Sequence, residues 1–110
     1  MEPEPGLLEV SRRGAVVTLT GEVDLSTSEL LRSELALACA FGDGAGDVVI
    51  DFRQLTFIGS SGVHVLIETA NLLGPRRLVL LGGGWAAYVV NLLGLTLRYP
   101  NIVVDAKTVL

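Results

Sequence analysis

Residues 48–66 constrain the fold of this chain more than any other segment. The run from Asp47 to Phe52 is apolar on both faces, which is typical of a strand that lies inside a sheet. A short connection leads from this strand to Ser60 and Ser61, and the residues that follow are apolar at helical spacing. The segment therefore predicts a buried strand followed by a helix that opens with a pair of hydroxyl groups.

The start of a helix is a special place for a hydroxyl group. It carries unpaired N–H groups and the positive end of the helix dipole, so it can accept a side-chain oxygen or a covalently attached phosphate. Ser60 or Ser61 could cap this helix, as serine often does, or one of them could be a phosphorylation site. The segment alone leaves both interpretations open.

Length and composition limit the class of protein. A chain of 110 residues is expected to form one domain, and an apolar content of 50% with only 18% charged residues predicts a compact fold with exposed apolar surface for a protein partner. The net charge is −4, and no basic cluster exceeds the pairs Arg12-Arg13 and Arg76-Arg77. The basic footprint of a nucleic-acid-binding protein is therefore missing.

The chain also lacks the sequence signals of secretion and membrane insertion. Cys39 is a single cysteine and cannot form an internal disulfide, and the first five residues are acidic where a signal peptide is basic. The longest apolar run is interrupted by glycines 82–84 and is too short to cross a bilayer. We expect a cytoplasmic protein with no membrane insertion, in which residues 1–6 form a flexible leader and residues 7–110 form the domain.

The first half of the chain predicts a hairpin and a helix. The runs Leu7–Ser11 and Ala15–Thr20 are rich in strand-forming residues and flank a turn. Ser26 and Glu29 have the spacing of a capping box, and Leu25 and Leu30 occupy the positions of a hydrophobic staple around it. This pattern predicts a helix that runs to about Phe41, with Leu31, Leu35 and Ala38 on its buried side.

The second half alternates helices with strands. Two further strands are predicted at Leu78–Leu81 and Ile102–Val104, and a helix at Trp85–Leu93, with Trp85 and Tyr88 toward its exposed side. Strands that alternate with helices after an initial hairpin indicate an α/β domain with a mixed, largely parallel sheet. The helix after Ser61 is expected to bury Val63, Leu66, Ile67, Ala70 and Leu73.

The inventory of reactive residues argues against an enzyme. The chain has one histidine and one cysteine, and no spacing of His, Cys, Asp or Glu indicates a metal site or a cofactor. The segment Gly59–Gly62 is similar to a nucleophile elbow, but that motif needs glycine where Val63 stands. The segment Gly82–Ala87 fits a dinucleotide-binding pattern, yet it lies in the last unit of a short chain, so we interpret it as a turn.

Four segments, taken in order, closely resemble the STAS domain of bacterial anti-anti-sigma factors, the anti-sigma factor antagonists. They are Gly21–Thr27, Val48–Phe52, Leu55–Gly62 and Val90–Leu95. The resemblance implies a single STAS domain that binds an anti-sigma factor, often a serine kinase, and thereby releases a sigma factor. In that family the kinase phosphorylates a serine of the antagonist and breaks the complex.

The resemblance also carries over to individual residues. The family motif is D-S-[ST]-G, which places the modified serine at Ser61, with Ser60 as second choice, and Gly59 stands where the motif has aspartate. An alternative function is that of a STAS subunit in a lipid-transport or other transporter assembly, where it would bind an ATPase without phosphorylation. The residues expected to contact the partner are Asp24, Gly59, Ser60, Ser61, Gly62 and His64.

Overall fold

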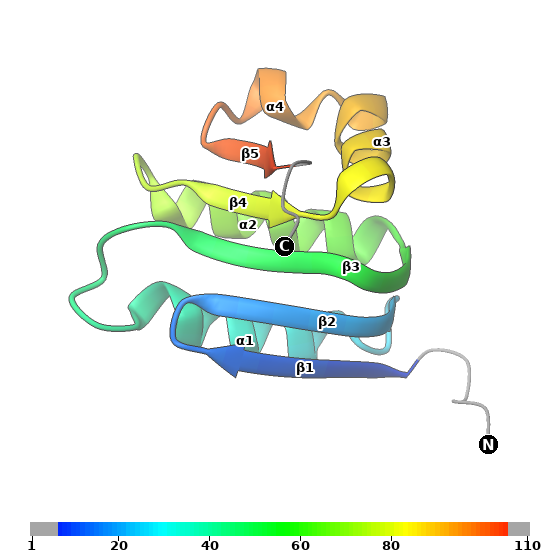
Figure 1. The fold of residues 1–110 in the computed structure, drawn as a ribbon, viewed down its shortest axis with the longest axis horizontal. Coiled ribbons are helices and arrows are strands. Elements are labelled where there is room, and N and C mark those ends of the chain that lie inside the picture. Colours follow the sequence, from blue (N-terminus) through cyan, green and yellow to red (C-terminus); the bar gives the residue numbers. More distant parts are fainter. Residues whose placement is uncertain (1–6, 106–110) are drawn as a thin grey trace.

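The computed structural model describes residues 7–105, apart from the side chains of residues 83–87 (Figure 1). The predicted leader, residues 1–6, and residues 106–110 of the predicted domain lie outside the described residues. The elements along the chain are β1 (Leu8–Arg13), β2 (Val16–Val23), α1 (Ser28–Ala40), β3 (Val48–Ile58), α2 (Ser60–Leu73), β4 (Leu78–Leu81), α3 (Gly83–Leu93), α4 (Leu95–Arg98) and β5 (Ile102–Asp105).

The predicted mixed sheet is confirmed. Its strands lie in the order β1-β2-β3-β4-β5; β1 and β2 pair antiparallel, and every later pair is parallel. Because parallel strands share one direction, the ends of β2, β3 and β4 that lead into α1, α2 and α3 lie at the same edge of the sheet, on the right in Figure 1. This edge is where open α/β sheets place their binding sites.

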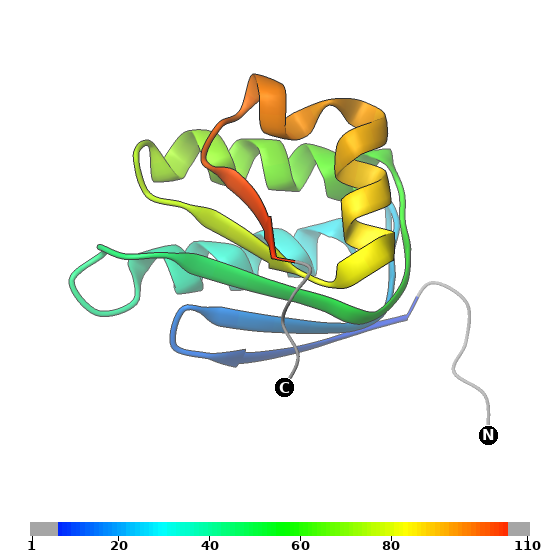
Figure 2. The same cartoon turned by 45° about the horizontal axis from the view of Figure 1, so that its top comes forward.

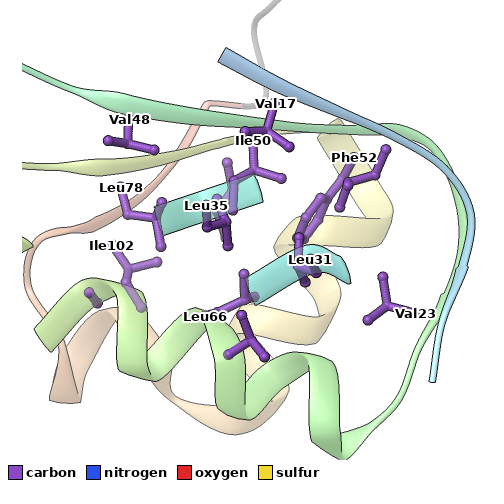
Figure 3. Close-up of a cluster of buried hydrophobic side chains, with 14 of the residues drawn as sticks. Val17, Val23, Leu31, Leu35, Val48, Ile50, Phe52, Leu66, Leu78 and Ile102 are labelled. Carbon is purple, nitrogen blue, oxygen red and sulfur yellow. The ribbon is translucent and has the colours of Figure 1, made fainter. Parts of the chain in front are cut away.

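The helices cover the sheet unevenly. Helices α1 and α2 lie side by side on one face, whereas α3 and α4 both contact β5 and α3 also contacts β3; Figure 2 shows the two short helices near β5. Figure 3 shows Val48, Ile50 and Phe52 of β3 pointing toward Leu31, Leu35 and Leu66 of the two covering helices. The alternation of a strand thus buries one set of side chains in the core. None of the helices in the described part of the chain is long and apolar enough to cross a membrane.

Several predicted boundaries were wrong. Strand β3 runs on to Ile58 instead of ending at Phe52, and its pairing with β2 contains two register irregularities, so the simple alternation of apolar residues is lost in this half. Helix α4 was not predicted. The buried side of α2 is formed by Gly62, Val65, Leu66, Thr69, Ala70 and Leu73, while Val63 and Ile67 are only half-buried.

Tyr88 of α3 and the end of α1 lie in different surroundings. Tyr88 is exposed as predicted, and the side chain of Trp85 lies outside the described residues. The end of α1 is held by Arg76, whose Nη1 donates to the carbonyl oxygen of Cys39 at 2.9 Å and whose Nε donates to that of Gly46 at 3.0 Å. These two hydrogen bonds tie α1 and the following loop to the turn before β4. The side chain of Cys39 is buried, and its thiol is free.

Candidate partner-binding site

The turn between β2 and α1 is organised by Asp24. Its Oδ1 accepts hydrogen bonds from the backbone N–H groups of Ser26 at 2.9 Å and Thr27 at 3.1 Å, and from the Ser26 hydroxyl at 2.7 Å. The helix begins at Ser28, after Thr27. The predicted capping box is therefore wrong: Ser26 donates to Asp24 rather than accepting from the helix, and Glu29 pairs with Arg32. A carboxylate is the stronger acceptor here because it is charged.

The same hydrogen bonds set the charge and shape of this turn. The hydrogen bonds from Ser26 and, to a smaller extent, from Thr27 hold the pKa of the Asp24 carboxyl below its ordinary value, so the group is ionised at neutral pH. Leu25, which lies between Asp24 and Ser26, is turned outward, and its side chain is 83% exposed. The predicted hydrophobic staple with Leu30 is therefore wrong, because Leu30 is also exposed.

Gly62 allows the first turn of α2 to pack closely against the sheet. A Cβ at Gly62 would lie 2.6 Å from a side-chain carbon of Ile58 and 2.6 Å from one of Val23, closer than real carbon atoms approach. Only glycine lets the first turn of α2 press against the ends of β2 and β3. Gly62 is buried, so it positions the two serines before it and does not itself face outward.

The two serines at this helix start are chemically available. Ser60 is exposed and Ser61 is half-buried. Gly59 is the N-cap residue of α2, and no side chain caps the helix. Serine therefore does not act as a cap here, which was one of the two interpretations that the sequence left open. In the described part of the chain, neither hydroxyl has a hydrogen-bond partner, and both serines line an open depression.

The starts of α1 and α2 form one open depression, which we call the two-helix depression. Across it, Arg32 of α1 donates from Nε to Oε1 of Glu68 in α2 at 3.0 Å and also pairs with Glu29. His64 Nε2 lies 3.7 Å from Oε2 of the same Glu68. The depression is lined by Leu25, Ser28, Glu29, Arg32, Ser60, Ser61 and His64.

The predicted site residues are thus only partly brought together. Ser60, Ser61 and His64 line the two-helix depression, and Gly59 directly precedes them. Asp24 lies next to the depression, but its carboxylate points into its own turn. Sequence reasoning missed Arg32 and Glu68, although His64 and Glu68 have the spacing of neighbours on one helix turn, which could have indicated the contact.

Asp51 and His64 each contact a charged side chain on their own strand or helix. The Asp51 carboxylate is bound by Arg53, whose Nη2 donates to Oδ2 at 2.7 Å. This bond lowers the pKa of the Asp51 carboxyl. His64 pairs with Glu68 on its own helix, one turn from Ser61. Within residues 7–105 no group of three His, Cys, Asp or Glu side chains could hold a metal ion.

Known proteins are similar to this chain in sequence and in fold. The STAS domain family matches residues 7–88. The anti-sigma-F factor antagonist RsfB of Mycobacterium tuberculosis is 32% identical over 98 residues, which cover 86% of this chain and 79% of that protein. An anti-sigma factor antagonist from Mycobacterium paratuberculosis has a crystal structure that superposes with a TM-score of 0.69 at 27% identity, over 88% of this chain and 84% of that one.

A second solved structure supports the fold alone. Unphosphorylated SpoIIAA, an anti-sigma factor antagonist, superposes with a TM-score of 0.63 at 20% identity, over 93% of this chain and 90% of that one. The family match covers strands β1 to β4, both covering helices and the two-helix depression. The four motifs, the fold and these comparisons agree, and the chain belongs to the STAS domain family.

Proposed function

We propose that this protein is an anti-sigma factor antagonist: it binds an anti-sigma factor in the cytoplasm and thereby releases a sigma factor. The observation that carries the proposal is the pair of unbonded hydroxyl groups of Ser60 and Ser61 in the two-helix depression. The similarity to anti-sigma factor antagonists of two mycobacteria supports it. The protein acts by binding rather than by catalysis and uses no metal or cofactor.

We further propose that Ser61 is the switch and that the anti-sigma factor is its kinase. The γ-phosphoryl group of ATP passes to the Ser61 Oγ, the hydroxyl proton is released, and ADP leaves. The phosphate adds a charge of about −1.5 to −2, which demands hydration that a packed contact surface does not provide. Arg32 in the depression already pairs with Glu29 and Glu68, so its charge is shared with two carboxylates. The complex is therefore released without refolding of the domain.

Direct binding and phosphorylation measurements test this proposal. The wild-type protein is titrated by calorimetry with each anti-sigma factor encoded in the same genome, and is then incubated with the one that binds and with ATP. We expect modification at Ser61 by mass spectrometry and loss of binding after it. Ser61→Ala should bind but resist release, and Ser61→Glu should bind poorly.

Ser60→Ala is the matched control, because it removes the neighbouring hydroxyl from the same helix turn. It should bind and be released like the wild type. Modification at Ser60 alone would show that the switch is Ser60 and not Ser61. If an active kinase modifies neither serine, the proposed switch is overturned. Binding to a transporter ATPase, and to no anti-sigma factor, would instead establish the alternative function as a transporter subunit.

A further inference from the structure

Leu25 is a leucine in an unusual place. Its side chain is 83% exposed, although it is flanked by the hydrogen-bonded residues Asp24 and Ser26, and α1 begins three residues later, at Ser28. It lines the two-helix depression together with Ser60 and Ser61. A single exposed leucine needs no explanation on a protein surface. This one, however, borders the two free hydroxyl groups of the proposed contact surface.

The exposure of Leu25 is built into the turn. Asp24 Oδ1 binds the N–H groups of both residues that follow Leu25, at 2.9 and 3.1 Å, and Thr27 Oγ1 donates to the carbonyl oxygen of Glu22 at 3.0 Å. The backbone on both sides of Leu25 is therefore fixed. A leucine whose backbone is already fixed has only its side-chain rotamers to order when a partner covers it, so binding loses less conformational entropy.

We propose that Leu25 is a specificity-determining residue, whose side chain enters an apolar pocket on the anti-sigma factor, and that Asp24 is the positioning residue that presents it. This inference rests on the proposed function. It assigns the partner a surface of defined chemistry: an apolar pocket for one branched side chain, next to an uncharged area that covers Ser60 and Ser61. Asp24 then affects binding through Leu25, not through its own charge.

The chain supplies a matched control for Leu25. Leu97 in α4 is 87% exposed, but it does not line the two-helix depression, and its helix packs beside α3 and β5. Leu25→Ser and Leu97→Ser therefore remove the same apolar surface from two different places. Because neither side chain is buried in the free protein, both variants should unfold at the wild-type temperature.

The test is a titration of each variant with the anti-sigma factor that binds the wild type. Burial of one leucine at the centre of an interface predicts that Leu25→Ser raises the Kd by about tenfold to a hundredfold. Leu97→Ser should leave the Kd within about twofold, the scatter expected of a residue outside the contact. Equal Kd values for Leu25→Ser and the wild type would overturn the inference, as would equal losses in both variants.

Two substitutions of Asp24 separate positioning from direct contact. Asp24→Asn keeps an oxygen that can accept from Ser26 and Thr27 but has no charge, whereas Asp24→Ala keeps neither. We expect Asp24→Asn to bind nearly as the wild type and Asp24→Ala to bind more weakly. In a Leu25→Ser background, Asp24→Ala should have little further effect, because the side chain that it positions is gone. Equal losses for Asp24→Asn and Asp24→Ala would show that the Asp24 charge itself contacts the partner.

The result distinguishes this inference from the function on which it rests. If the wild-type protein binds none of the anti-sigma factors, the proposed function fails and the role of Leu25 fails with it. If the wild type binds and Leu25→Ser binds equally well, the function stands and the role of Leu25 is overturned.

Discussion

Gly59 shows how one residue can change a site without changing its fold. It occupies the position at which the family motif has aspartate, directly before the two serines. Its backbone is extended, with φ −91° and ψ −175°, so any residue can adopt its conformation. A Cβ there would lie 3.3 Å from the nearest ring carbon of Phe57, which must shift by a few tenths of an ångström. The position therefore tolerates a side chain.

The first prediction restores the carboxylate of the motif. Gly59→Asp should fold, and its unfolding free energy should stay within about 1 kcal/mol of the wild type, because the contact with Phe57 can relax. We expect the proposed kinase to phosphorylate Ser61, the proposed switch, faster in this variant, as measured by the initial rate of phosphate incorporation. Gly59→Ala adds the same Cβ without the charge and should leave the rate unchanged. The same acceleration in both variants, or in neither, would contradict a role for the carboxylate.

At the scale of elements, the seating of α2 depends on a close approach. The first turn of this helix lies against Val23 and Ile58 at the ends of β2 and β3, and Gly62 is the residue at the contact. The backbone N–H of Gly59 also donates to the carbonyl oxygen of Val23 at 2.9 Å. The position of Ser60 and Ser61 is therefore fixed by packing between a helix and two strands rather than by a cap.

The second prediction tests this packing. Gly62→Ala should lower the unfolding free energy by about 1–3 kcal/mol, because the added methyl group overfills a tight contact. The gain of about 0.5–1 kcal/mol that alanine brings to a helix interior is too small to compensate. Urea denaturation measures the change, and Gly59→Ala is the control with a milder contact. A Gly62→Ala variant as stable as the wild type would show that α2 can move away from the sheet at little cost.

At the scale of the whole molecule, the two faces of the sheet differ. Helices α1 and α2 cover one face, and the structure describes no helix over the other (Figure 1). Half-buried apolar side chains of β3, β4 and β5, among them Val49, Val79 and Val103, line a shallow depression on that second face. The ion pair between Asp47 and Arg77 lies at its border. Apolar surface is thus exposed away from the proposed switch as well.

Three aspartates make the stability of the fold depend on pH in the same way. The pKa values of Asp24, Asp47 and Asp51 are all lowered, mainly by hydrogen bonds from Ser26, Arg77 and Arg53, respectively. An unfolded chain therefore takes up protons at a higher pH than the folded protein does. The stability contributed by these groups is complete above about pH 5 and is lost as the pH falls through the folded pKa values.

The third prediction follows from this linkage. Asp51→Asn should be less stable than the wild type at pH 7 and should lose less stability between about pH 5 and pH 3, because its pair with Arg53 no longer titrates. Thermal unfolding at a series of pH values measures both effects. Glu9→Gln removes an exposed carboxylate of β1 and should keep the wild-type profile. Parallel profiles for Asp51→Asn and the wild type would assign the acid sensitivity to other groups.

The order of strands and helices was predictable because it depends on local patterns. The apolar run from Asp47 to Phe52 and the helical spacing after Ser61 indicated β3 and α2, and both are present. Where the pattern was irregular, the prediction failed: β3 continues past Phe52, and its pairing with β2 shifts register there. Short elements without their own periodicity, such as α4, gave no signal.

The sequence by itself therefore determined the α/β class, the mixed sheet and the serine pair at the start of α2, because each follows from residues close together in the chain. Only the tertiary structure decided what surrounds that pair. Arg32 meets Glu68 across two helices, and Leu25 is exposed because Asp24 outcompetes Ser26 as the acceptor in its turn. The first contact depends on how the strand-to-strand connections bring the starts of α1 and α2 together. The second depends on the carboxylate of Asp24 being a stronger acceptor than the hydroxyl of Ser26. The spacing of residues along the chain reveals neither.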